Sequence, residues 1–351
     1  MAKKTILVAG ALGLIGRTLI EHCETLPDIE VIGIGRRKPD FPSRAHFVSV
    51  DLLDRADCEQ KLSSLSAITH ILYAAWIPAA TRGEEVAPNL AMLRNLMETL
   101  EPRAQALRHV TLLQGGKAYG SHLGNFMTPA IETDPRHMPP NFYYDQEDYL
   151  AALQKRAGWA WTIFRPTVVY GLAYGNPMNM TTVIAVYAAI SKELGLPLRF
   201  PGSDKAYRTL CQGVDADLIA RAILWAGDSE AACNQIYNIT NGDLFRWSRM
   251  WPRIAKLFDL ALAEPQPIPL VEYMSAHEPL WNAMVRRHNL RPISYRDAAA
   301  WPFGEFILKR EFDHVLDTTK LRAHGFDGFE DTYRMFERQI VRLREDAMIP
   351  Q

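Results

Sequence analysis

The chain has 351 residues, of which 48% are hydrophobic and 23% charged, a composition that fits an ordinary globular protein and excludes disorder or a collagen-like repeat. Its 39 basic and 40 acidic side chains leave a formal net charge of −1. Because nucleic-acid-binding proteins normally carry a large basic excess, no nucleic-acid partner is expected. The length favours about two domains.

The cysteines and the apolar runs indicate the cellular compartment in which the protein is expected. No cysteine pair has CxxC or disulfide-framework spacing, and no run approaches the roughly 20 apolar residues that span a bilayer. The first residues lead directly into a predicted strand, without an apolar signal region. We therefore expect a cytoplasmic protein with no membrane association. Neither HExxH nor paired Cys/His spacing occurs, so no metal site is expected. The cysteines are Cys23, Cys58, Cys211 and Cys233.

Short apolar runs alternate with helical patterns over the first half of the chain, which is typical of a parallel sheet covered by helices on both faces. The clearest helix is 86–100, where Val86, Leu90, Leu93 and Met97 recur at intervals of three and four. Six apolar runs with intervening helices predict an α/β fold with a doubly wound Rossmann sheet. The predicted strands are 5–9, 31–34, 47–50, 70–74, 110–113 and 161–164.

Beyond residue 170 the pattern changes to short helices interrupted by Pro- and Gly-rich pieces. A later strand at 235–239 is placed to return to the main sheet. We therefore predict a dinucleotide-binding Rossmann domain over residues 1–170 with a return segment at 214–240. Residues 171–351 are predicted to form a smaller, mostly helical substrate-binding lobe.

A glycine-rich turn follows the first predicted strand and opens the first helix. Its sequence, Gly10-Ala11-Leu12-Gly13-Leu14-Ile15-Gly16, has the GxxGxxG spacing, and a second strand follows about 20 residues later. Such a turn needs glycine for its tightness, for close approach of the backbone to pyrophosphate and for helix–strand packing. The start of the helix then faces the phosphates. Gly10, Leu12, Gly13, Leu14 and Ile15 are therefore predicted to contact a dinucleotide.

The end of the second strand indicates which dinucleotide is bound. An NAD site usually has a carboxylate there, whereas this chain has Arg36 and Arg37. Two guanidiniums suit the 2′-phosphate of NADP through charge-assisted hydrogen bonds, so NADP(H) is the predicted cofactor. Asp51-Leu52 after the third strand is placed to meet the adenine, and Ala74-Ala75 after the fourth could pass beneath the cofactor.

The catalytic residues do not follow the usual arrangement of nicotinamide enzymes with this fold, in which a Lys lies four residues after a Tyr. Tyr143 is followed at that spacing by Glu147, Tyr144 by Asp148 and Tyr119 by Leu123. Two other segments stand near those places instead. One is 112–120, which contains Gln114 and Lys117, and the other is 141–148.

With these residues in view, the chain resembles the progesterone 5β-reductase/iridoid synthase-like (PRISE) family, an atypical branch of the extended short-chain dehydrogenases/reductases. The similarity runs nearly end to end, and its most specific parts are the Asn141-Phe142-Tyr143-Tyr144 block and the displaced Lys117. Further matches are Arg36-Arg37-Lys38-Pro39, Thr69-His70, Tyr73, Trp76, Asn89, Met92 to Asn95, Glu147-Asp148, Arg165-Pro166, Gly171, Asp215 to Ala220, Asn238 to Asp243, Trp247 and Gly325 to Phe329.

The resemblance implies NADPH-dependent reduction of the C=C bond of an α,β-unsaturated carbonyl compound, an enone or enal. It places the catalytic tyrosine at Tyr143 and the catalytic lysine at Lys117. A phenol aimed at the carbonyl oxygen would stabilise the developing enolate, and the lysine would add a positive field. The nearby ammonium is expected to lower the pKa of Tyr143. We also assign Gln114, Tyr143, Pro166 and Val168 to the cofactor site, and Trp76, Tyr119, Tyr144 and Phe303 to the substrate site.

Several alternatives stay open. Tyr144 could be the functional tyrosine, and Lys117 could be a ribose ligand or a surface residue. Phe303 could belong to the core. The chain could be a nucleotide-sugar epimerase or dehydratase with retained NAD, or a non-catalytic NADP-binding regulator. Gly115 stands where the family usually has Thr, and Ala118 where His is frequent. These departures beside Lys117 leave the identity of the substrate open. A homodimer is compatible with the resemblance.

Overall fold

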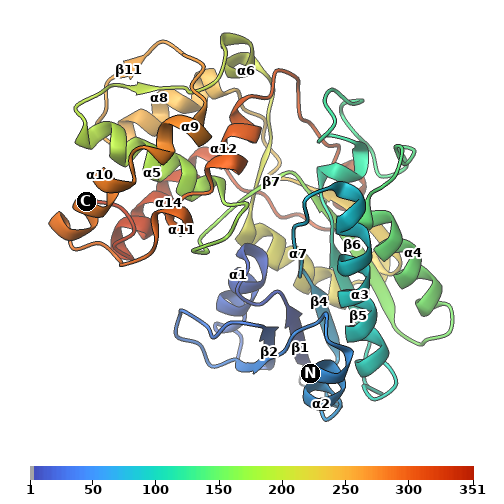
Figure 1. Ribbon diagram of the computed structural model, residues 1–351. Helices are drawn as coiled ribbons and strands as arrows, with labels where there is room; N and C mark the ends of the chain where they lie inside the picture. Colours follow the sequence, from blue (N-terminus) through green and yellow to red (C-terminus); the bar gives the residue numbers. More distant parts are fainter. Residues whose placement is uncertain (1–3) are drawn as a thin grey trace. The chain divides into compact units, whose positions relative to one another are not determined.

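The computed structural model describes residues 4–351 (Figure 1). The chain divides into two compact units. Unit 1 contains residues 4–166, Ala216–Ile239 and Asp317–Gly328, and unit 2 contains Thr167–Asp215, Thr240–Leu316 and Phe329–Gln351. The sequence placed residues 317–328 in the substrate lobe. In the structure this segment belongs to unit 1, where α13 (Thr319–Ala323) packs beside β10 (Gln235–Ile239).

Unit 1 is built on a seven-stranded sheet in the order β10-β6-β5-β4-β1-β2-β3. Every neighbouring pair in this sheet is parallel. All six predicted strands are present, and the predicted return strand 235–239 pairs with β6 at the edge of the sheet. The strands are β1 (Lys4–Ala9), β2 (Ile29–Gly35), β3 (His46–Ser49), β4 (His70–Tyr73), β5 (His109–Leu113), β6 (Ala160–Pro166) and β10. The predicted doubly wound Rossmann fold is confirmed.

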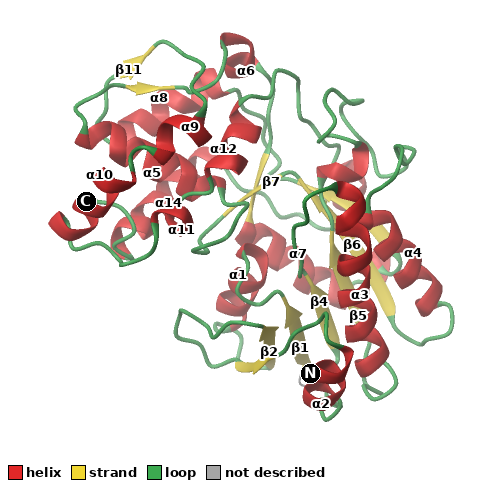
Figure 2. Cartoon of the chain, viewed as in Figure 1, coloured by secondary structure: helices red, strands yellow, loops and turns green. Residues whose placement is uncertain are grey.

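Helices cover both faces of this sheet (Figure 2). On one face α1 packs against α7, and on the other α3 packs against α2 and α4. The helix predicted at 86–100 begins one turn earlier, at Arg82, because Thr81 and Glu84 form a capping box at its start. The helices and 3₁₀ turns of unit 1 are α1 (Leu14–Cys23), α2 (Arg55–Leu62), α3 (Arg82–Leu100), η1 (Gly116–Tyr119), α4 (Phe142–Gln154), α7 (Ala216–Asp228), η2 (Glu230–Ala232) and α13.

Unit 2 is mostly helical and has its own aromatic core. Its helix α5 (Met180–Glu193) is buried along almost its whole length, as an apolar helix without a polar face should be. Phe200 and Trp251 meet edge to face in the core, with ring centroids 5.3 Å apart. Two short parallel pairs, β7 (Val168–Tyr170) with β9 (Gly213–Asp215) and β8 (Leu198–Arg199) with β11 (Leu262–Ala263), were not predicted. The other elements are α6 (Asp204–Arg208), α8 (Trp247–Leu257), α9 (Leu270–Ser275), α10 (Glu278–Arg287), α11 (Tyr295–Ala298), α12 (Trp301–Leu308) and α14 (Thr332–Glu345).

The four cysteines are free thiols, and burial raises the pKa of Cys23 and Cys58 to about 11. Within residues 4–351, no helix combines the length and the apolar character needed to cross a membrane. The described part of the chain also lacks a group of three or more His, Cys, Asp or Glu side chains arranged to hold a metal ion.

Candidate functional site

The glycine turn lies at the point where the strand order of unit 1 reverses, between β1 and β4. Gly10 has a positive φ of 86°, and a Cβ on it would lie 2.8 Å from the carbonyl of Ala74. A Cβ on Gly16 would lie 2.3 Å from the carbonyl oxygen of Gly10. Both glycines are therefore required by the packing of the turn. In open α/β sheets, this edge at the carboxyl ends of the strands is where ligands bind.

The start of α1 is suited to bind an anion. Its N-cap is Gly13, which offers no side-chain oxygen to the first-turn amides, and the first turn holds no acidic residue. The amides from Leu14 and Ile15 onward therefore add their polarity to the positive end of the helix dipole. A dinucleotide pyrophosphate fits this end of the helix, with Leu12 in the preceding turn.

Arg36 and Arg37 directly follow the end of β2 and are exposed. Within the described residues neither side chain forms a hydrogen bond or an ion pair, so both guanidiniums are available to a phosphate. Asp51-Leu52 forms an ordered turn: Asp51 Oδ1 accepts a hydrogen bond from Leu53 N at 3.0 Å, and Asn95 donates to the Leu52 carbonyl at 2.9 Å. These residues fit the ribose-phosphate and adenine half of a dinucleotide.

Lys117 lies in the 3₁₀ turn after β5. Its ammonium lies over the ring of Trp76, 5.5 Å from the centroid, and forms no hydrogen bond or ion pair with any residue in 4–351. Burial, with a smaller contribution from Arg82, lowers the pKa of Lys117 to about 8. The indole nitrogen of Trp76 is also buried without a partner. This ammonium is therefore available to a bound ligand.

Tyr143 lies in the first turn of α4, and its hydroxyl has no hydrogen-bond partner among the residues described. The hydroxyl lies beside Gly115, where an added Cβ would be 3.5 Å from it. Since Lys117 is only two residues beyond Gly115, the phenol and the lysine-bearing turn are neighbours. The expectation that the pKa of Tyr143 is lowered is wrong: burial raises it, and desolvation outweighs the charges nearby. The phenol therefore stays protonated at neutral pH.

The two other predicted tyrosines have hydroxyls bound to the protein itself. Tyr144 donates to the Ala118 carbonyl at 2.8 Å and accepts from His137 N at 3.1 Å. Tyr119 donates to Asn238 Oδ1 at 2.6 Å. Both side chains are buried, and their hydroxyls are held in place by the protein, whereas the hydroxyl of Tyr143 has no partner among the described residues.

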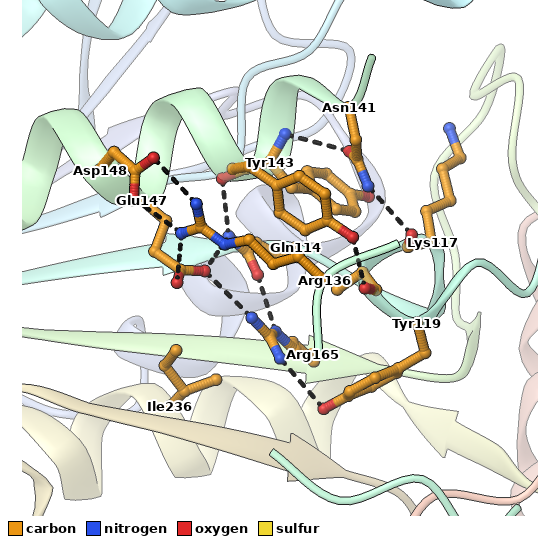
Figure 3. Close-up of polar contacts among 12 residues, drawn as sticks. Gln114, Lys117, Tyr119, Arg136, Asn141, Tyr143, Glu147, Asp148, Arg165 and Ile236 are labelled. Atoms are coloured by element: carbon orange, nitrogen blue, oxygen red, sulfur yellow. Dashed lines mark hydrogen bonds and ion pairs between the residues drawn. The ribbon is translucent and has the colours of Figure 1, made fainter. Parts of the chain in front are cut away.

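A polar network beneath Tyr143 was not predicted from the sequence (Figure 3). Gln114 follows β5 and donates to the Tyr143 carbonyl at 3.0 Å and to Glu147 at 3.2 Å. Arg165 in β6 donates to Gln114 Oε1 at 2.9 Å and to Glu147 at 3.0 Å. Arg136 donates to the other Glu147 oxygen at 2.8 Å. The signal available in the sequence was Glu147, the acidic residue at the position where a lysine usually stands.

The remaining predicted site residues lie partly in unit 1 and partly in unit 2. Ala74 and Ala75 follow the end of β4. Pro166 is the last residue of β6, and its carbonyl oxygen would lie 3.5 Å from a Cβ added to Gly115. Val168 begins β7 and Phe303 lies in α12, both in unit 2 and both packed against its hydrophobic core. Phe303 therefore packs within unit 2, and its contact with substrate stays a prediction.

Comparison with known proteins gives one family over most of the chain. A family model described as the PRISE-like Rossmann-fold domain matches residues 46–350. An (S)-8-oxocitronellyl enol synthase from Camptotheca acuminata is 34% identical over 369 residues, covering 98% of this chain and 93% of that protein. A 3-oxo-Delta(4,5)-steroid 5-beta-reductase from Arabidopsis thaliana is 33% identical over 365 residues, covering 98% and 92%.

Solved structures share the fold at lower identity. A UDP-glucose 4-epimerase from Thermotoga maritima with UDP-glucose has a TM-score of 0.69 and 18% identity, covering 97% of this chain and 99% of that one. A UDP-glucose 4-epimerase from Thermus thermophilus, in complex with NAD, has a TM-score of 0.67 and 20% identity, with the same coverage. At this identity the likeness establishes the architecture alone.

Proposed function

Because this chain belongs to the PRISE-like Rossmann-fold domain family, we propose that it is an NADPH-dependent reductase of the C=C bond of α,β-unsaturated carbonyl compounds. The names of its relatives, an enol synthase and a steroid 5-beta-reductase, support this reaction class. The observation that carries the proposal is a protonated, unpartnered phenol at Tyr143 beside the turn that bears the unpartnered ammonium of Lys117.

The cofactor proposal rests on the glycine turn, the uncapped start of α1 and the two free guanidiniums. Gly10, Gly13, Leu14 and Ile15 would hold the pyrophosphate, and Arg36 with Arg37 would hold the 2′-phosphate. NADPH supplies the hydride when bound. Ala74, Ala75, Gln114 and Pro166 complete the unit 1 part of the proposed cofactor site.

In the proposed reaction, the β-carbon gains hydride, negative charge develops on the carbonyl oxygen, and the enolate then takes a proton from water at its α-carbon to give the saturated ketone. Tyr143 donates a hydrogen bond to that oxygen, and Lys117 lowers the energy of the enolate through its positive charge. A phenol with a raised pKa is a persistent donor at neutral pH, which suits this role. Removing one such donor typically costs about 10²–10³ in rate. Trp76, beside Lys117, would form part of the substrate wall.

The test measures NADPH consumption with 2-cyclohexen-1-one and identifies the product, comparing wild type with Tyr143→Phe. Saturated ketone from wild type and a rate loss of about 10²-fold or more in the variant are expected. Tyr149→Phe is the matched control, since Tyr149 lies on the same helix and its hydroxyl also lacks a partner in the described structure. An allylic alcohol product would contradict conjugate reduction. Absence of turnover with tightly retained NAD would favour an epimerase.

A further inference from the structure

We propose that Glu147 is a positioning residue for Tyr143, acting through Gln114 and Arg165. The inference rests on the proposed function, because it assigns a role at the same site. Tyr143 and Glu147 are four residues apart in α4, so their side chains leave the same face of the helix one turn from each other. A carboxylate therefore lies one helical turn from the phenol that would stabilise negative charge.

The carboxylate of Glu147 is held by three donors from three segments. Arg165 Nη2 and Gln114 Nε2 donate to one oxygen, and Arg136 Nη2 donates to the other. The side chain of Glu147 is 14% exposed and that of Arg165 only 5%. The charge-assisted hydrogen bond between Glu147 and the buried Arg165 fixes geometry strongly, because little water can reach it as an alternative partner.

Gln114 connects the fixed carboxylate of Glu147 to the backbone of Tyr143. Its amide group bonds three partners at once: Nε2 donates to the Tyr143 carbonyl and to Glu147, while Oε1 accepts from Arg165. The closed ring of Gln114, Glu147 and Arg165 therefore connects the ends of β5 and β6 to the residue that carries the phenol (Figure 3). A shift of the Tyr143 peptide group would break its hydrogen bond to Gln114 in this ring.

The network also keeps the carboxylate from acting on the phenol. Glu147 pairs with both Arg165 and Arg136, which neutralises its carboxylate, whereas the exposed Asp148 pairs with Arg136 alone. Loss of the Glu147 charge would leave Arg165 buried without an acidic partner, which disturbs the ring as well as the helix. A displacement of about 1 Å at a reacting group can cost about 10²-fold in rate.

The experiment compares Glu147→Gln with Asp148→Asn, each alone and in the Tyr143→Phe background. Asp148 is the matched control, because it binds the same Arg136 but is 66% exposed and contacts neither Gln114 nor Arg165. Glu147→Gln is expected to lower kcat for 2-cyclohexen-1-one by about 10²-fold. The Kd for NADPH, followed by its fluorescence, should stay nearly unchanged, and Asp148→Asn should retain wild-type kcat.

The double variant separates positioning from general damage. If Glu147 acts through Tyr143, Glu147→Gln has little further effect once the phenol hydroxyl is gone, whereas structural damage lowers the rate in both backgrounds. Equal losses in the two backgrounds, or wild-type kcat in Glu147→Gln, would overturn the inference. If Glu147→Gln does not fold, Glu147→Asp, which keeps the charge and shortens the reach, enters the same cycle.

A spectroscopic readout keeps the inference testable without turnover. If wild type reduces no enone, the proposed function fails, and ¹³C-tyrosine resonances then decide the positioning role. The Tyr143 signal, assigned by its loss in Tyr143→Phe, is expected to shift or broaden in Glu147→Gln and to stay in place in Asp148→Asn. An unmoved Tyr143 signal in Glu147→Gln would refute the positioning role by itself.

Discussion

Asn141 Nδ2 donates a hydrogen bond to the carbonyl oxygen of Lys117 at 3.0 Å. The other atom of the same amide, Oδ1, accepts from the backbone N–H of Tyr143 at 3.1 Å and caps the start of α4. One side chain therefore connects the backbones of the proposed catalytic lysine and tyrosine, although 26 positions separate these residues in the numbering. His137 shares the Lys117 carbonyl, with its Nε2 3.0 Å away.

Replacing Asn141 by Asp is expected to separate helix capping from this connection. Aspartate caps helices about as well as asparagine, so α4 should keep its start. The donor to Lys117 is lost, however, and a carboxylate oxygen then faces the carbonyl oxygen. We expect kcat to fall by at least about tenfold, since small misplacements of reacting groups are costly.

The control for this change is Asn179→Asp at the start of α5. Asn179 has the same pair of contacts, with Oδ1 accepting from Thr182 N and Nδ2 donating to the Ala173 carbonyl. Thermal unfolding and kcat are measured for both variants. A comparable loss of kcat in the two, after correction for folded protein, would show that the connection to Lys117 has no special role.

The activity should decline as the pH rises through about 8. The pKa of Lys117 is lowered to about 8 by burial, so its ammonium is fully present below that pH and is lost above it. If the positive charge stabilises the enolate, kcat falls towards tenfold per pH unit on the alkaline side. Lys117→Arg keeps the charge at every accessible pH and should remove this decline, as should the slower Lys117→Met. An unchanged alkaline limb in Lys117→Met would assign the titration to another group.

Arg36 and Arg37 should set the preference for NADPH over NADH. Their side chains are exposed and unengaged in the described structure, and each charge-assisted contact to phosphate is worth about 1.5–3 kcal/mol. Arg36→Ala with Arg37→Ala should raise the Kd for NADPH by at least about tenfold and leave that for NADH nearly unchanged. Fluorescence titration of both nucleotides measures this, with the exposed Arg156→Ala as control. An equal loss for both nucleotides would place the arginines elsewhere on the cofactor.

Gly115 should influence which enones are accepted. Its backbone is extended, with φ of 168°, so the conformation does not require glycine. An added Cβ would make ordinary contacts of 3.5 Å with Tyr143 Oη and the Pro166 carbonyl, so Gly115→Ala should fold normally. The methyl would occupy space beside the phenol, where a substituent near the substrate carbonyl would lie.

The measurement compares 2-cyclohexen-1-one with its 2-methyl derivative. Gly115→Ala is expected to lower kcat/KM for the methylated enone by about tenfold more than for the parent, the usual effect of one misfitting methyl group. Gly158→Ala, where an added Cβ meets nothing within 4 Å, is the control. Equal effects on both enones in Gly115→Ala would show that this space does not contact the substrate.

The sequence predicted most of unit 1 because its signals are local. The parallel strands appear in the sequence as apolar runs, and the glycine turn can be identified from the spacing of its glycines. The ring of Gln114, Glu147 and Arg165 lies in three separate segments, and no periodicity relates them. The two short strand pairs of unit 2 are too brief to leave a pattern.

The direction in which the pKa of Tyr143 is shifted also could not be predicted from the sequence. A neighbouring lysine suggests a lowered value, but desolvation depends on how completely the surrounding chain encloses the phenol. The resemblance placed the catalytic tyrosine at Tyr143 and left Tyr144 as an alternative, and the structure adds that the hydroxyl of Tyr144 is bound to the Ala118 carbonyl.

In this chain Lys117 lies in a turn and Tyr143 in a helix, so one helical turn does not fix the distance between the two groups. Two groups four residues apart on one helix keep a fixed separation, and any mutation that moves one moves the other. Here the loop between the Lys117 turn and α4 can lengthen, shorten or exchange residues, provided that Asn141 still connects the Lys117 carbonyl to the start of α4. Changes in that loop can therefore alter the surroundings of the phenol without altering the sheet or α4.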